Sequence, residues 1–165
     1  MRATPPVILV VEDDPTTRGL LWDILDSTGY IVETVADGAA AMRRIFTGEI
    51  DVVLLDQMLP LVHGLDLCRK VRATTFDVHL PIIMLTALSS EEHRRAALAA
   101  GADVFLTKPF DIDELLYVIE RWVQARDRRK AERKHAVAAG ASAPAAVGAV
   151  YEAWSSAASQ SRRWQ

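Results

Sequence analysis

Asp51-Val-Val-Leu-Leu-Asp56 is an uninterrupted apolar run with an acidic residue at each end. Such a run is typical of a β-strand that is buried on both faces, as the strands of parallel sheets are. In open α/β sheets, ligands and chemistry lie at the carboxyl ends of the strands. Asp56 occupies that end of the predicted strand, and its carboxylate is therefore the first candidate for a functional group.

Strand and helix patterns alternate on both sides of this run. Four further segments have β-branched or apolar strand character: Val7–Val11, Tyr30–Val35, Leu80–Thr86 and Asp103–Thr107. A signal typical of a helix start follows four of the five strands: Asp14 before Pro15, Asp37, a Ser89-x-x-Glu92 capping box, and Asp111. After the Asp51–Asp56 strand, we expect a helix from about Gly64 to Ala73. Five strands alternating with five helices predict an α/β fold with a parallel sheet covered on both faces.

The composition is that of one globular domain with an appendage. The chain has 165 residues, a net charge of −3 and a single cysteine, Cys68, which excludes an internal disulfide and a multi-cysteine zinc site. The first apolar run, Val7–Val11, is too short for a signal-peptide core or a membrane span. We therefore expect a cytoplasmic protein with no membrane partner.

Charge divides the chain into an acidic body and a basic tail. Residues 1–125 hold 11 Lys and Arg against 19 Asp and Glu, whereas residues 126–165 hold 8 against 3. The acidic balance argues against nucleic-acid binding by the body. We divide the chain into a body at 1–125, a basic extension of the last helix at 126–139, and an Ala/Ser-rich, partly disordered tail at 140–165.

The basic run at 126–134 has two interpretations. The first is a solvated helix face; the second is a patch for nucleic acid or an acidic partner, or a helix extension that pairs in a dimer. The run lacks a sustained apolar heptad repeat, so a long coiled coil is not expected. The tail that follows is too short and too rich in Ala, Gly and Ser for a winged-helix output domain, and we expect no separate output domain.

Two acids, Glu12 and Asp13, follow the first predicted strand. In a parallel sheet they share one edge with Asp56, and three converging carboxylates repel one another unless a proton or a cation neutralises them. Oxygen ligands without histidine or thiolate suit a hard ion, and we predict Mg²⁺. Thr86 and Lys108 end two further strands at the same edge, where a hydroxyl and an ammonium can contact phosphoryl oxygens.

A family resemblance rests on four motifs: Val10-Val-Glu-Asp-Asp14, Leu54-Leu-Asp-Gln-Met-Leu-Pro60, Met84-Leu-Thr-Ala87 and Gly101-Ala-Asp-Val-Phe-Leu-Thr-Lys-Pro-Phe110. Their spacing is 43 residues from Asp13 to Asp56, a further 30 to Thr86 and a further 22 to Lys108. In these motifs the sequence, from residue 7 to about 124, resembles the receiver domain of two-component response regulators. The resemblance implies a flavodoxin-like, doubly wound sheet with strand order 2-1-3-4-5, here with an extended C-terminal helix.

The resemblance also implies a role for each matching residue. Asp56 would be the phosphoacceptor, and Lys108 would pair with the phosphoryl group. Mg²⁺ would be held by Glu12, Asp13, Asp56 and the backbone carbonyl of Met58. The switch that responds to phosphorylation would consist of Thr86, Phe105 and a cis peptide bond between Lys108 and Pro109.

The sequence departs from the family pattern at three places. His63 stands where an acid usually precedes Gly64, Val104 replaces a common second acid, and Tyr117-Val118 stand where dimerising regulators often have an arginine. The phosphorylation residues are unaffected. A homodimer through the fourth helix, fifth strand and fifth helix would lack part of its usual ion-pair network.

We therefore expect a receiver that takes a phosphoryl group from the phosphohistidine of a sensor kinase or phosphotransfer protein and switches a surface for a downstream protein. It would be no enzyme beyond catalysing its own phosphorylation and a slow loss of the group, because Met58 and Leu88 position no water. The alternative is a docking module that works without phosphorylation. A phosphatase acting on other molecules would need an acid where Met58 stands and is set aside.

Overall fold

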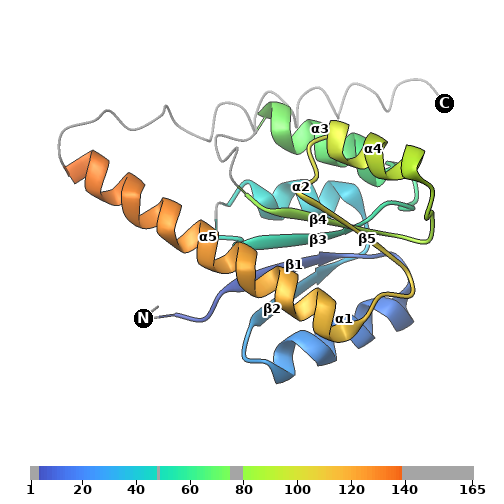
Figure 1. Ribbon diagram of the computed structural model, residues 1–165, viewed down its shortest axis with the longest axis horizontal. Coiled ribbons are helices and arrows are strands. Elements are labelled where there is room, and N and C mark those ends of the chain that lie inside the picture. Colours follow the sequence, from blue (N-terminus) through green and yellow to red (C-terminus); the bar gives the residue numbers. More distant parts are fainter. Residues whose placement is uncertain (1–3, 48, 75–79, 139–165) are drawn as a thin grey trace.

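The computed structural model of the chain describes residues 4–47, 49–74 and 80–138 and has a layered α/β architecture (Figure 1). Five parallel strands form one sheet in the order β2-β1-β3-β4-β5, which confirms the predicted order. The strands are β1 (Val7–Val11), β2 (Ile31–Val35), β3 (Val52–Asp56), β4 (Ile82–Thr86) and β5 (Val104–Thr107). The helices are α1 (Pro15–Ser27), α2 (Gly38–Ile45), α3 (Gly64–Thr74), α4 (Glu91–Ala99) and α5 (Ile112–Ala138). Within the three described ranges, no helix combines the length and the apolarity that crossing a bilayer requires.

Helices cover both faces of the sheet (Figure 1). The helices α2, α3 and α4 pack on one face, where they meet alternate strand residues such as Leu9 and Val53. The helices α1 and α5 pack on the other face, against residues such as Ile8 and Leu54. Every residue of β3 is buried, because this central strand is covered on both sides.

Strand register determines which side chains meet at the carboxyl edge of the sheet. The pairing of β1 with β3 places Glu12 and Asp56 next to each other, one residue beyond the last registered pair. The strands β4 and β5 are paired through their last residues, so that Thr86 lies level with the residue before Lys108. The predicted site residues therefore gather at one edge, as expected for an open parallel sheet.

The helix start predicted at Ser89 is wrong by one residue. Ser90 has the extended backbone of an N-cap, and its hydroxyl accepts a hydrogen bond from the backbone N–H of His93 at 3.3 Å. The helix α4 consequently begins at Glu91. Two adjacent serines offer the same cap chemistry, and the sequence pattern does not distinguish between them.

The last helix, α5, continues well past the sheet and is the longest helix of the described chain (Figure 1). Its residue Arg126 is only 3% exposed, donates a hydrogen bond to the carbonyl of Ile50 at 2.8 Å, and forms an ion pair with Asp51 at 3.4 Å. Lys130, one turn later, also forms an ion pair with Asp51. The interpretation of 126–134 as a uniformly solvated face is therefore wrong for Arg126, which fastens the start of the extension to the sheet. The predicted tail at 140–165 lies outside the described residues.

Candidate functional site

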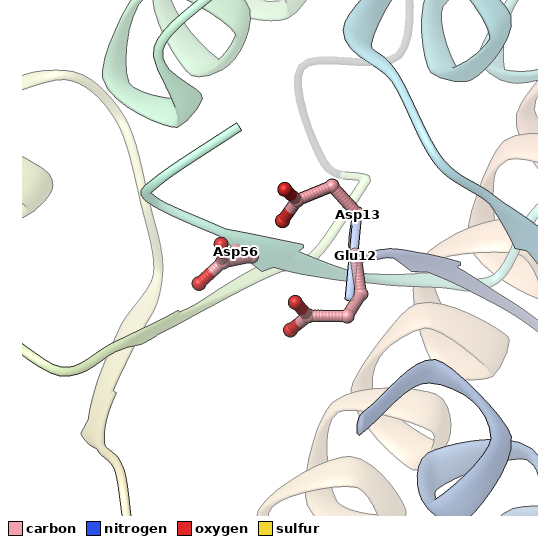
Figure 2. A group of neighbouring side chains, drawn as sticks. All are labelled: Glu12, Asp13 and Asp56. Atoms are coloured by element: carbon pink, nitrogen blue, oxygen red, sulfur yellow. The ribbon is translucent and has the colours of Figure 1, made fainter. Parts of the chain in front are cut away.

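Three carboxylates meet at the carboxyl edge of the sheet. Glu12 and Asp13 directly follow β1, Asp56 ends β3, and one oxygen of each lies within 4.8 Å of the others. Figure 2 shows the three side chains projecting toward the same side of the strand ends. Glu12 and Asp56 are only 2% and 4% exposed, whereas Asp13 faces solvent. The structure thus brings together the cluster that the sequence predicts.

Lys108, just beyond β5, provides a positive charge for the two buried acids. Its ammonium donates hydrogen bonds to Glu12 Oε2 at 2.6 Å and to Asp56 Oδ1 at 3.0 Å. Burial raises the pKa of Glu12 above its ordinary value, and the hydrogen bond from Lys108 offsets only part of this effect. Burial by itself would lower the pKa of Lys108, but the hydrogen bonds to both carboxylates outweigh it and raise that pKa. Lys108 is therefore a cation at neutral pH.

The donor set at this edge fits a divalent cation. One ammonium compensates at most one of the three carboxylates when all are ionised, and no hydrogen bond to the Asp13 carboxylate occurs within the described part of the chain. Carboxylate oxygens without histidine or thiolate are the ligands that Mg²⁺ prefers. The backbone N–H of Met58 donates a hydrogen bond to Asp56 Oδ2 at 3.1 Å. The role of the Met58 carbonyl in binding the ion stays a prediction.

The predicted switch residues lie on β4, β5 and the loop that follows. Thr86 is fully buried, and its hydroxyl oxygen accepts a hydrogen bond from the backbone N–H of Leu88 at 3.0 Å. Phe105 is partly buried and packs against the core on the α2–α3–α4 side of the sheet. The peptide bond between Lys108 and Pro109 is cis, the isomer that the resemblance implied. The switching roles themselves stay predictions.

One residue that sequence reasoning missed holds the acidic loop in place. The guanidinium of Arg18, on α1, donates to the backbone carbonyl of Glu12 at 2.8 Å and to that of Asp13 at 2.9 Å. These bonds fix the backbone from which two of the carboxylates project. An arginine in the first turns of a helix looks like a solvated residue in sequence, so no local signal revealed this contact.

Gly64, the first residue of α3, makes a second contact that the sequence did not reveal. Its backbone N–H donates to the carbonyl of Gln57 at 2.9 Å, which closes the loop after β3. A Cβ atom at this position would lie 2.4 Å from the carbonyl oxygen of Asp56 and 2.8 Å from the Cα atom of Gln57. The absence of a side chain at Gly64 therefore lets α3 begin directly against the backbone of Asp56.

Comparison with known proteins places this arrangement in a family. The family model described as "Response regulator receiver domain" matches residues 8–120. The transcriptional regulatory protein TcrA of Mycobacterium tuberculosis is 45% identical over 108 residues, which cover 66% of this chain and 42% of that protein. The response regulator MprA of Mycobacterium sp. strain KMS is 46% identical over 112 residues, which cover 68% of this chain and 48% of that protein.

A solved structure gives the same result at the level of the fold. The receiver domain of the sensor histidine kinase PA1611 from Pseudomonas aeruginosa PAO1, with a magnesium ion coordinated in its active-site cleft, has a TM-score of 0.68 and 36% identity. The match covers 73% of this chain and 99% of that domain. The chain spans about half the length of the curated relatives it matches. The chain belongs to the family of response-regulator receiver domains.

Proposed function

We propose that this chain is a cytoplasmic phosphoprotein that receives a phosphoryl group on Asp56 from the phosphohistidine of a sensor kinase or phosphotransfer protein. The observation that supports this most strongly is the meeting of Glu12, Asp13, Asp56 and Lys108 at one strand edge. Mg²⁺ would be held by the three carboxylates and the carbonyl of Met58. Bound there, it would neutralise phosphoryl oxygens as they approach the acids.

Each oxygen of the Asp56 carboxylate accepts a hydrogen bond, and these two bonds orient the carboxylate for attack on phosphorus. Lys108 contacts Oδ1, and the backbone N–H of Met58 contacts Oδ2. In the proposed transfer an Asp56 oxygen forms a bond to phosphorus while the P–N bond to the donor imidazole breaks, and the electron pair of that bond leaves with the imidazole nitrogen. Lys108 then pairs with a phosphoryl oxygen, because a compact ammonium near the new dianion is favourable.

The output would be a change in a protein-binding surface. Thr86, Phe105 and the loop at Pro109 would favour one of two arrangements of the α4–β5–α5 face when Asp56 carries a phosphoryl group. The two helices that border this face expose three large apolar side chains in the described chain, Leu98 on α4 and Ile112 and Tyr117 on α5, which suit a downstream protein or a second copy. A complete shift from 1:99 to 99:1 needs roughly 5.5 kcal/mol of differential stabilisation.

Incubation with acetyl phosphate and Mg²⁺ is expected to add the mass of one phosphoryl group to the intact chain. The group should be absent from Asp56→Asn, because an amide is not a nucleophile for phosphorus, and absent when EDTA removes the metal. Intact-protein mass spectrometry measures both results. Phosphorylation of Asp56→Asn to the same extent would contradict the proposal, and no phosphorylation of the wild type would favour the docking module.

The phosphoryl group is expected to be lost slowly once it is attached. Met58, which is 53% exposed, and Leu88 are the apolar residues two positions beyond Asp56 and Thr86, and neither can position an attacking water by hydrogen bonding. Substitution Met58→Asn supplies an amide there and should speed the loss. The decay of the phosphorylated mass after removal of acetyl phosphate measures both rates, and a wild-type half-life of seconds would contradict the expectation.

A further inference from the structure

Leu61, in the loop between β3 and α3, has an unusual conformation for its residue type. Its φ of 68° lies in the left-handed region, which leucine adopts rarely. The backbone N–H of Val62 donates to the carbonyl of Pro60 at 2.8 Å, so that Leu61 is the central residue of a γ-turn of the rare, strained kind. The Leu61 side chain is also fully exposed. The backbone of Leu61 is therefore strained, although its side chain buries no apolar surface in the fold.

The neighbours of Leu61 hold this turn in a defined position. Leu59 is buried in the core on the α2–α3–α4 side, and Val62 packs against the same core, close to Gly38. The bond from Gly64 N–H to the Gln57 carbonyl closes the loop at its base. The turn is anchored before and after its central residue. Leu61 is therefore held in an exposed position by the packing of its neighbours.

Leu61 belongs to the same short loop as the backbone that contacts the phosphoacceptor. Met58, whose N–H binds Asp56 Oδ2, also exposes its side chain. Asp56 is only 4% exposed, so that a protein donor must bring its phosphohistidine close to this loop to reach the carboxylate. Met58 and Leu61 thus expose apolar side chains two and five residues after Asp56, in the loop that a protein donor has to approach.

We propose that Leu61, together with Met58, is an apolar docking contact for the protein that donates the phosphoryl group to Asp56. The donor would present an apolar side chain beside its phosphohistidine, and burial of Leu61 against it would hold the histidine in reach of Asp56. This inference rests on the proposed phosphoacceptor function. It explains why an apolar residue occupies a turn position that asparagine or glycine would occupy without strain.

Substitution Leu61→Asn tests the inference by separating protein donors from small ones. The protein donor is chosen from the autophosphorylated histidine kinases of the organism that makes this chain, as the one that transfers fastest to the wild type. We expect kcat/KM for transfer from this kinase to fall about tenfold or more, as loss of one buried leucine predicts. The rate with acetyl phosphate should change less than twofold, because a small molecule does not span to Leu61. The melting temperature should rise by about 2–4 °C, because asparagine relieves the turn.

The matched control is Ile31→Thr, which replaces an exposed apolar residue at the opposite end of the sheet from Asp56. It should leave both transfer rates unchanged. Equal transfer from the kinase to wild type and Leu61→Asn would overturn the inference, as would an equal loss with both donors. A wild-type chain that accepts from acetyl phosphate but from no kinase overturns the docking contact alone, and a chain that accepts from neither overturns the phosphoacceptor function as well.

Discussion

Substitution Gly64→Ala is expected to destabilise the fold by about 1–3 kcal/mol and to impair phosphorylation of Asp56. The added Cβ would meet the carbonyl oxygen of Asp56 at 2.4 Å and the Cα atom of Gln57 at 2.8 Å. Both are backbone atoms at the end of β3, so that no flexible side chain can move aside. Relief of the clash requires a shift of α3 or of the strand end, and the second shift would move the Asp56 carboxylate away from Lys108.

The measurements are urea unfolding followed by circular dichroism and the rate of phosphorylation by acetyl phosphate. Gly19→Ala is the matched control, because Gly19 lies within α1 and an added Cβ there meets no atom within 4 Å. Alanine at an open helix position should stabilise the chain by about 0.5–1 kcal/mol and leave phosphorylation unchanged. If both glycine variants were equally stable and equally active, the close approach of α3 to Asp56 would not matter.

Much of the fold and of the site could be predicted because local patterns carry the information. The run from Asp51 to Asp56 reads as a doubly buried strand, and β3 is buried at every position. Parallel strands end at a common edge, so that placing Glu12 and Asp56 required only the strand assignments. The position of Lys108 at this edge followed from the same rule, whereas its hydrogen bonds to both buried acids became evident only in the structure.

Long-range contacts of basic helix residues were not predictable in this way. Arg72, near the end of α3, donates to the carbonyls of Gly101 and Leu80 and forms an ion pair with Asp103, joining three segments. In sequence it looks like any arginine on a solvated face. Helical periodicity indicates which residues share a face of a helix. Which distant residue one of them contacts depends on how the helices and strands pack.

Substitution Arg126→Met is expected to cost about 3 kcal/mol of folding free energy. Arg126 and Asp51 are both 3% exposed, and removal of one member of a buried ion pair leaves the other charge less well compensated. The value is at the lower end of the range for such pairs, because Lys130 remains beside Asp51 and can take over part of the compensation. Lys130 is far more exposed than Arg126, so that Lys130→Ala, the matched control, should cost less than about 1 kcal/mol.

A double-mutant cycle decides whether the pair itself carries this effect. Asn at residue 51 can still accept the hydrogen bond that Asp51 takes from the backbone N–H of Val7 at 3.0 Å, so that Asp51→Asn removes mainly the charge. The double variant should be more stable than the sum of the single losses predicts, by about 0.5–3 kcal/mol. Additive losses in urea unfolding would mean that Arg126 acts through its hydrogen bond to the Ile50 carbonyl and its packing, and not through the Asp51 pair. A chain that ends after residue 125 lacks both cations beside Asp51 and should therefore lose more stability than Arg126→Met. The folded body would then extend into the basic segment as far as the ion pair, and a boundary drawn at residue 125 from apolar periodicity would cut through it.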